Sequence, residues 1–350
     1  MSHVYQAVGW NRQKRLYDAV VAVGVCAYVG LFVGVGSLVF PSATAETLTI
    51  RGVGSLAFLL LHVILCIGPL CRLDPRLLPL LYNRRHLGVV TFLLSLTHGS
   101  FAIVQFHALG DRNALVSLFI SNHNFASLPN FPFQQLGFFA LIILFLMAAT
   151  SHDFWLRNLT PPVWKRLHML VYAAYALLVA HVTLGELQSE RSPILLFATA
   201  SGLLSVIALH LAAARKESKR DHKTYNSAAD GFVDACALDR VPEKCAAVVS
   251  IGGERIAIFK YDGKISAVSN VCRHQNGPLG EGKIVDGCIT CPWHGYQYLP
   301  KDGTSPPPFT EKVSTFRTRI FGDRVWVDPK PNPPGTAVPP SKIQNASVSG

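Results

Sequence analysis

The sequence predicts a multi-domain membrane protein, in which a six-helix transmembrane bundle is followed by a small all-β domain. Half of the 350 residues are apolar and only 15% are charged, a skew that is typical of membrane proteins. This skew ends near residue 214. From Phe232 onward, short β-rich runs are broken by Gly-Gly and Asp-Gly pairs, which are turn signals of β-hairpins. A chain of this length has room for both domains.

Six long apolar segments account for the predicted bundle. Each is close to the roughly 20 residues that a bilayer-spanning helix needs. The first is too long and too poor in a small-residue cleavage site for a secretory signal peptide. The alternative, in which these segments are buried helices of a large soluble protein, fits six such segments poorly. They cover about residues 19–40, 48–70, 87–109, 131–151, 167–185 and 193–214.

Lys and Arg are concentrated in alternate loops, and such residues are retained on the cytoplasmic side. We therefore predict a multi-pass protein of the cell inner or plasma membrane, in contact with membrane lipid, with cytoplasmic N- and C-termini. This topology accounts for most of the net charge of +11, so we expect no nucleic-acid partner. The basic clusters are Arg12, Lys14 and Arg15; Arg72, Arg76, Arg84 and Arg85; Arg157, Lys165 and Arg166; and Arg215, Lys216, Lys219 and Arg220.

The predicted domain boundaries follow from these shifts in composition. Residues 1–16 form a cytoplasmic N-terminus, 17–214 the six-span domain, and 215–230 a basic linker. Residues 231–329 form the β domain, and the Pro- and Ser-rich residues 330–350 form a disordered tail, because such composition buries too little apolar surface to fold.

Two mixed pairs of cysteine and histidine lie within the β domain and predict a metal centre. Cys272 and His274 form a Cys-x-His pair, and Cys291 and His294 form a Cys-x-x-His pair. Two thiolates and two imidazoles can hold either a zinc ion or a [2Fe–2S] cluster. Cys2His2 zinc fingers place both cysteines before both histidines, whereas here each pair is mixed.

The residues around these pairs favour the cluster, with a structural zinc site as the alternative. CRHQNGPLGEG and CPWHGYQY resemble the cluster loops of Rieske proteins. That resemblance implies that Cys272 and Cys291 bind one iron of a [2Fe–2S] cluster, and His274 and His294 the other. Gly277 and Trp293 stand where high-potential Rieske proteins carry an extra cysteine pair, and Tyr296 where a serine hydroxyl would donate. The resemblance is thus to the ferredoxin-like branch and implies a potential low in the Rieske range.

Histidines within the apolar segments predict a second cofactor, since ionisable residues in spans are costly and usually functional. His98 lies about 11 residues into the third span and His181 about 14 into the fifth. Both of these spans enter from the cytoplasm, so at ~1.5 Å per residue the two histidines reach similar depths. Two facing imidazoles are a natural axial pair for a b-type haem.

Spans three and five also carry a family resemblance. RRHLGVVTFLLSLTHG and WKRLHMLVYAAYALLVAHVTLG are similar to the ferric reductase-like transmembrane superfamily, and closest to the haem-binding membrane subunit of the periplasmic methionine sulfoxide reductase system. The resemblance covers roughly residues 50 to 212. It implies two stacked haems, with His98, His168 and His181 as ligands.

The fourth ligand position is where the chain departs from this pattern, because it holds Arg84. His86 is two places away, about 120° off the face of His98 on an ideal helix. We expect one well-bound haem b at His98 and His181. A second haem at His168, with His86 or another partner, stays open.

These features predict a membrane-bound electron-transfer protein that relays single electrons between a cytoplasmic-side Rieske [2Fe–2S] cluster and b-type haem. Whether the chain is itself an enzyme stays open, because we find no flavin or nicotinamide domain after the last span. Separate redox partners are therefore expected, such as a flavin reductase, a ferredoxin or a quinol. Acidic residues near the cluster, Glu281 or Asp286, could dock on Arg84, Arg85, Lys165 or Arg166. The alternatives are a ferric or other metal reductase at the outer face, or a redox sensor.

Overall fold

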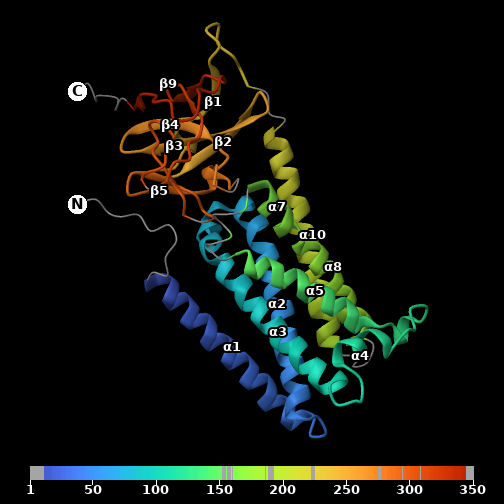
Figure 1. The fold of residues 1–350 in the computed structure, drawn as a ribbon. Coiled ribbons are helices and arrows are strands. Elements are labelled where there is room, and N and C mark those ends of the chain that lie inside the picture. Colours follow the sequence, from blue (N-terminus) through green and yellow to red (C-terminus); the bar gives the residue numbers. More distant parts are fainter. Residues whose placement is uncertain are drawn as a thin grey trace. The chain divides into compact units, whose positions relative to one another are not determined.

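The computed structural model describes residues 12–151, 155, 159, 161–185, 187, 193–221, 225–274, 277–293, 295–307 and 309–343. Its described residues fall into two compact units. Unit 1 contains Pro69–Tyr82 and Leu211–Gly350, and unit 2 contains Trp10–Gly68 and Asn83–His210. Unit 2 is helical, and unit 1 holds the strands together with the ends of two helices (Figure 1).

The helices follow the apolar segments of the sequence. Among the residues that the structure describes, five helices are long and apolar enough to cross a membrane: Arg15–Val39, Ala45–Leu73, Arg84–His107, Val163–Leu184 and Pro193–Lys219. The fourth predicted span is a shorter apolar helix, α5, of 17 residues. The structure therefore confirms an apolar helical domain, with five long helices where we predicted six spans. The helices are α1 (Arg12–Val39), α2 (Ala45–Leu73), α3 (Arg84–His107), α4 (Ala114–Ile120), α5 (Phe133–Ala149), α7 (Pro161–Met169), α8 (Val171–Leu184) and α10 (Pro193–Asp221), with 3-10 turns η1 (Pro75–Asn83) and η2 (Leu128–Asn130).

Unit 2 has a small interior and a large apolar exterior, as expected of a helical membrane domain. One buried cluster joins α2, α8 and α10 through Leu61, Tyr175 and Val206. Another joins α2 and α3 through Val53 and Leu94. Helix α5 packs mainly against α8 and also against α3. Large apolar side chains such as Leu31 and Phe197 are exposed, as lipid-facing residues are.

Helix α10 extends further than the sequence predicted, because it reaches Asp221. The predicted linker therefore begins as helix over residues 215–221. The segment RKESKRD explains this extension, since Lys, Arg and Glu are good helix formers even when they are exposed.

The strands form three antiparallel sheets, confirming the small all-β domain. Their orders are β1-β10-β9, β11-β4-β3-β2 with β8 paired to β4, and β5-β6-β7. The strands are β1 (Val233–Ala237), β2 (Ala246–Ile251), β3 (Glu254–Tyr261), β4 (Lys264–Ser269), β5 (Lys283–Val285), β6 (Cys288–Thr290), β7 (Gln297–Tyr298), β8 (Thr315–Phe316), β9 (Thr318–Phe321), β10 (Arg324–Val327) and β11 (Ser341–Lys342), with 3-10 turns η3 (Leu238–Arg240) and η4 (Leu279–Glu281).

Asp-Gly pairs form the turns of two hairpins, of which the sequence indicated the one at Asp262 and Gly263. Asp262 and Gly263 connect β3 to β4 with φ of 46° and 69°. Asp286 and Gly287 connect β5 to β6 with φ of 50° and 76°. Two consecutive positive φ values match the right-handed twist of a hairpin, and Asp-Gly is a preferred pair for them.

The chain after residue 330 differs from the predicted disordered tail. Ser341 and Lys342 form β11, which pairs with β4 opposite Ile265 and Lys264. The Val338 amide donates to Lys301 at 2.7 Å. Proline-rich composition suits an extended segment at the edge of a sheet, so this segment adds an edge strand; residues 344–350 lie outside the described residues.

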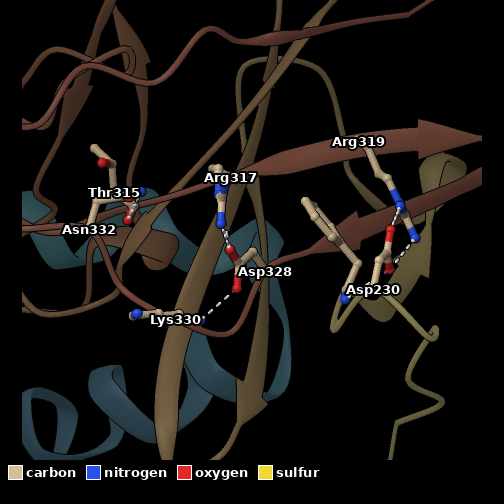
Figure 2. Close-up of polar contacts among 8 residues, drawn as sticks. Asp230, Thr315, Arg317, Arg319, Asp328, Lys330 and Asn332 are labelled. Atoms are coloured by element: carbon tan, nitrogen blue, oxygen red, sulfur yellow. Dashed lines mark hydrogen bonds and ion pairs between the residues drawn. The ribbon is translucent and has the colours of Figure 1, made fainter.

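Ion pairs between arginine and aspartate connect segments within the sheet domain (Figure 2). Arg317 Nη2 lies 2.6 Å from Asp328 Oδ2, and the Asp328 amide also donates to the Arg317 carbonyl at 2.9 Å. Arg319 pairs with Asp230 and stacks over Phe232 at 4.3 Å. The Arg317–Asp328 pair reinforces a contact that a backbone hydrogen bond already makes, and exposed ion pairs of this kind add little free energy of unfolding.

Candidate metal centres

Two tight loops position the predicted cluster ligands. The first follows β4 and carries Cys272, whose amide donates to the Gly277 carbonyl at 2.9 Å. The second follows β6 and carries Cys291, whose amide donates to Tyr296 at 2.8 Å. Each loop thus returns on itself within a few residues. Both thiols are buried, with 1% of each cysteine exposed.

The two loops meet at the cysteines. A Cβ added at Gly277 would lie 2.7 Å from Cys291 Sγ, so the first loop packs directly against the second thiol. Only glycine allows this approach without displacing the sulfur. The structure therefore brings Cys272 and Cys291, which are far apart in sequence, into one buried core with Leu279 and Tyr298.

His274 lies on the first loop and stacks on Tyr296, with ring centroids 4.7 Å apart and an interplanar angle of 11°. Burial lowers the pKa of His274, and the carboxylate of Glu311 opposes that shift. A lowered pKa favours neutral imidazole, which is the form that binds metal. His294, the fourth predicted ligand, lies outside the described residues.

Tyr298 contacts a predicted cluster ligand, and the sequence analysis did not select it. Its hydroxyl oxygen accepts a hydrogen bond from the Arg273 amide at 3.0 Å and lies 3.4 Å from Cys272 Sγ. Because the oxygen already accepts, its own proton is available to the sulfur. Burial and the neighbouring thiols raise the pKa of Tyr298, which keeps this donor protonated.

Tyr296, which the sequence analysis singled out, has another partner. Its hydroxyl donates to a Glu311 carboxylate oxygen. Tyr298 is the last residue of the motif CPWHGYQY, which the sequence analysis quoted. Tyr296 and Tyr298 are two residues apart and would share one face of an extended strand, so the sequence could not show which tyrosine reaches Cys272.

The donor set fits the predicted cluster. Two buried thiols and an imidazole lie on loops that pack together, and a hydroxyl donates toward one sulfur. Soft thiolates on one iron and imidazoles on the other are the ligands of a Rieske centre. Among the described residues, no three His, Cys, Asp or Glu side chains are grouped as ligands of a single metal ion.

In unit 2, the structure pairs the two histidines predicted to be axial ligands. His98 of α3 and His181 of α8 have ring centroids 6.2 Å apart, with the rings at 89°. Nδ1 of His98 lies 3.0 Å from the Ile50 carbonyl, and Nδ1 of His181 lies 2.9 Å from the Phe133 carbonyl. A carbonyl accepts from N–H, so these bonds leave each Nε2 as the nitrogen that can bind metal.

Two glycines make room for these imidazoles. A Cβ added at Gly54 of α2 would lie 2.6 Å from His98 Nδ1, and one at Gly137 of α5 would lie 2.8 Å from His181 Cε1. Any other residue at either position would push the ring out of place. Four helices therefore build the pair, although only α3 and α8 carry the histidines.

The separation of the pair fits two ligands of one metal ion. An imidazole nitrogen binds metal at about 2.0–2.1 Å, and the ring centre lies about an ångström further, so opposed imidazoles have centroids roughly 6 Å apart. The observed 6.2 Å agrees with this value. His98 and His181 are therefore suited to hold a haem iron between them.

The other two predicted haem residues contact different groups. His168 of α7 stacks on Trp164 at 3.8 Å, and its Nε2 lies 3.5 Å from Ser151 Oγ. His86 of α3 pairs through Nδ1 with Asp18 of α1 at 2.8 Å. The structure thus assigns each of them a polar or aromatic neighbour. A second haem at His168 stays a prediction.

Comparisons with known proteins match the two parts of the chain separately. Residues 231–317 match the Rieske [2Fe-2S] domain, and residues 51–179 match the ferric reductase like transmembrane component. The biphenyl dioxygenase ferredoxin subunit of Pseudomonas sp. (strain KKS102) is 36% identical over 100 residues, which cover 28% of this chain and 91% of that protein.

Further similar proteins are also ferredoxins. The ferredoxin component of the naphthalene 1,2-dioxygenase system from Pseudomonas aeruginosa is 30% identical over 98 residues, covering 28% of this chain and 94% of its own. Among solved structures, the ferredoxin of carbazole 1,9a-dioxygenase from Nocardioides aromaticivorans IC177 is 22% identical. That match covers 28% of this chain and 98% of the ferredoxin, with a TM-score of 0.27.

Proposed function

Because the chain belongs to the Rieske [2Fe–2S] family through its sheet domain and carries a ferric reductase-like transmembrane domain, we propose that it relays single electrons between the cluster and a haem b. The cluster is held by Cys272, His274, Cys291 and His294. The haem is held by His98 and His181. The two matched domains make the protein a membrane redox protein that transfers electrons, and the relay is the specific form that we propose.

The observation that carries this proposal is the His98–His181 pair, whose 6.2 Å separation suits a shared iron. The same chain supplies a one-electron cluster and a one-electron haem, which when bound exchange single electrons. The protein residues fix the ligands: Ile50 and Phe133 set the imidazole tautomers, and Gly277 packs the two cluster loops together.

The electron donor and acceptor are separate molecules under this proposal. Several relatives of the sheet domain are ferredoxins of dioxygenase systems, so a flavin reductase or another ferredoxin is the expected donor class, with a quinol as the alternative. We propose that the cluster faces the cytoplasm of a plasma or inner membrane, because the basic loops favour that orientation.

Replacing either member of the histidine pair tests the haem site. His98→Ala or His181→Ala is expected to remove most low-spin haem absorbance in purified membranes, because each change leaves one axial imidazole and an open position. His210→Ala is a matched control, since His210 binds the Tyr172 hydroxyl at 3.0 Å. His168→Ala should remove less absorbance than either. Equal loss from all three would contradict the single strong pair and place His168 in a full second site.

Tyr298→Phe is expected to lower the reduction potential of the cluster. The hydroxyl donates toward Cys272 Sγ, and reduction makes that sulfur more negative, so the bond stabilises the reduced form. If the bond strengthens by roughly 0.5–1.5 kcal/mol, the potential falls by about 20–60 mV, at 59 mV per tenfold change for one electron. A redox titration monitored by electron paramagnetic resonance (EPR) measures the reduction potential of the cluster.

Tyr261→Phe is the control for this change. Tyr261 is buried in the same core, but its hydroxyl bonds Ser266 at 2.8 Å. An unchanged potential in Tyr298→Phe, or an equal fall in both variants, would show that the Tyr298 hydroxyl does not act on the cluster.

A further inference from the structure

Unit 1 contains more than the sheet domain, because the segment Pro69–Tyr82 and the last turns of α10 belong to it. The first segment includes the end of α2. Both segments are covalently continuous with apolar helices of the membrane domain. Charged side chains of both segments contact the sheet domain.

Arg255, at the start of β3, makes the first contact. Its Nη1 donates to Glu217 Oε2 at 2.7 Å, its Nε donates to Asp221 Oδ1 at 3.0 Å, and its Nη2 donates to the other oxygen of Asp221. Glu217 and Asp221 are four residues apart and share one face of α10. The Arg255 guanidinium thus makes two bonds to the Asp221 carboxylate and a third to Glu217. Such a bidentate ion pair is more specific and stronger than a single surface ion pair.

The environment of Arg255 agrees with this geometry. The bond to Asp221, followed by the charges of Glu217 and Asp221, raises the pKa of Arg255. Its side chain is 37% exposed, so dissolved salt can reach and screen the pairs.

Arg72, at the end of α2, makes the second contact. Its Nε lies 3.7 Å from Glu281 Oε1 of η4. Lys216 of α10 donates to the carbonyls of Arg72 and Leu73 at 2.8 and 3.0 Å, which is a favourable place for a cation at a helix C-terminus. The last two turns of α10 therefore bind both the end of α2 and the start of β3. The structure places Glu281 beside Arg72, a basic residue that the sequence analysis did not consider as a partner of Glu281.

Both contacts connect to the loop that carries Cys272 and His274. The Arg255 carbonyl accepts from the Asn270 amide at 2.8 Å. The Asn270 carbonyl and side chain accept from the amides of Leu279 and Gly280 at 2.9 and 2.6 Å. Glu281, the partner of Arg72, is the next residue after Gly280. The first cluster loop is thus held between a residue bonded to Arg255 and a residue paired with Arg72.

We propose that Arg255 and Arg72 are positioning residues that form an electrostatic latch. The latch holds the cluster-bearing end of the sheet domain on the ends of α10 and α2 and thereby sets the rate at which the cluster exchanges electrons with the membrane domain. Its effect on rate rests on the proposed relay. Its effect on the position of the cluster does not.

The arginine pairs within the sheet domain provide the comparison. Arg317 pairs with Asp328 at 2.6 Å, but these two residues are also joined by a backbone hydrogen bond (Figure 2). Loss of the Arg317 charge should therefore leave the position of the sheet domain unchanged. Arg255 and Arg72 instead join segments that are distant in sequence, with a helix of the membrane domain on one side and the sheet domain on the other.

The test uses the full-length protein in oriented membrane multilayers and compares wild type with Arg255→Gln and Arg317→Gln. The orientation dependence of the reduced-cluster EPR signal reports the position of the sheet domain without involving haem. We expect ordered g axes in wild type and Arg317→Gln, and disordered axes in Arg255→Gln with unchanged g values. Glu217→Gln combined with Asp221→Asn removes the partners of Arg255 and should give the same disorder even if Arg255→Gln folds poorly.

The rate of cluster-to-haem electron transfer is the second readout. Raising KCl from 0.1 to 1 M shortens the Debye length from about 10 to about 3 Å, so the wild-type rate should fall about tenfold. Arg255→Gln should be slow at both salt concentrations. Arg72→Glu should also be slow, and adding Glu281→Arg should restore the rate by re-forming the pair with reversed charges.

Two outcomes would overturn the latch. Ordered cluster axes in Arg255→Gln and in the Glu217→Gln, Asp221→Asn protein would show that these pairs do not hold the domain. Disordered axes with a wild-type rate would show that the latch does not control transfer. If the relay itself fails, haem reduction is insensitive to loss of the cluster, and the orientation measurement still decides whether the latch holds the domain.

Discussion

Replacing Cys272 or Cys291 with serine is expected to abolish the EPR signal of the reduced cluster while leaving haem absorbance intact. Each iron of a [2Fe–2S] centre relies on its two protein ligands, and in the proposed Rieske centre both cysteines would bind the same iron. The two thiols are buried in the core of the sheet domain, whereas His98 and His181 belong to unit 2. The wild-type signal should have an average g below that of all-cysteine [2Fe–2S] centres, because the irons have different ligands.

Cys288→Ala is the matched control for this loss. Cys288 is a buried cysteine of β6, three residues before Cys291, and burial raises the pKa of its thiol, which disfavours the thiolate form that binds metal. This variant should retain the signal. A Rieske-type signal that survives Cys272→Ser, or a wild-type protein that holds zinc and no acid-labile sulfide, would contradict the assignment of the cluster.

The sequence was enough to predict a Rieske domain, which the family match confirms, because ligand spacing is a local property; the individual ligands stay a prediction. The order of Cys272, His274, Cys291 and His294 separates a Rieske centre from a zinc finger, and the family match agrees. The structure places three of these residues, and His294 lies outside the described residues. Gly277 and Cys291 lie on different loops. The sequence of either loop alone therefore could not predict their contact.

For the predicted haem pair, too, local motifs identified the histidines, whereas the contacts between helices could not be predicted. Motifs on two spans were enough to select His98 and His181. The carbonyls that fix their tautomers belong to Ile50 and Phe133, 48 residues away in each case. The glycines that admit the rings lie on α2 and α5. These contacts depend on helix packing, for which apolar periodicity gives no register between helices.

Parts of the predicted linker and tail are in regular structure, which composition did not indicate because it reports average behaviour. Residues 215–221 are charged enough to suggest a linker, yet they continue α10 and bind Arg255. The segment from Lys330 is rich in proline, yet it ends in β11. In both cases contacts with distant residues order a segment whose own composition would allow disorder.

Loss of the fast phase of haem reduction is the second large effect that we expect, and it tests the relay most directly. The measurement mixes oxidised full-length protein with a pulse of reduced donor and follows the haem optically and the cluster by freeze-quench EPR. Reduced ferredoxin, a flavin reductase with its nicotinamide and a quinol are tried in turn as donors. Wild type and Cys288→Ala should reduce the cluster first and the haem afterwards, whereas Cys291→Ser should lose the fast phase of haem reduction with the donor that reduces the cluster. Equal rates of haem reduction in wild type and Cys291→Ser with every donor would place the cluster off the pathway and contradict the relay.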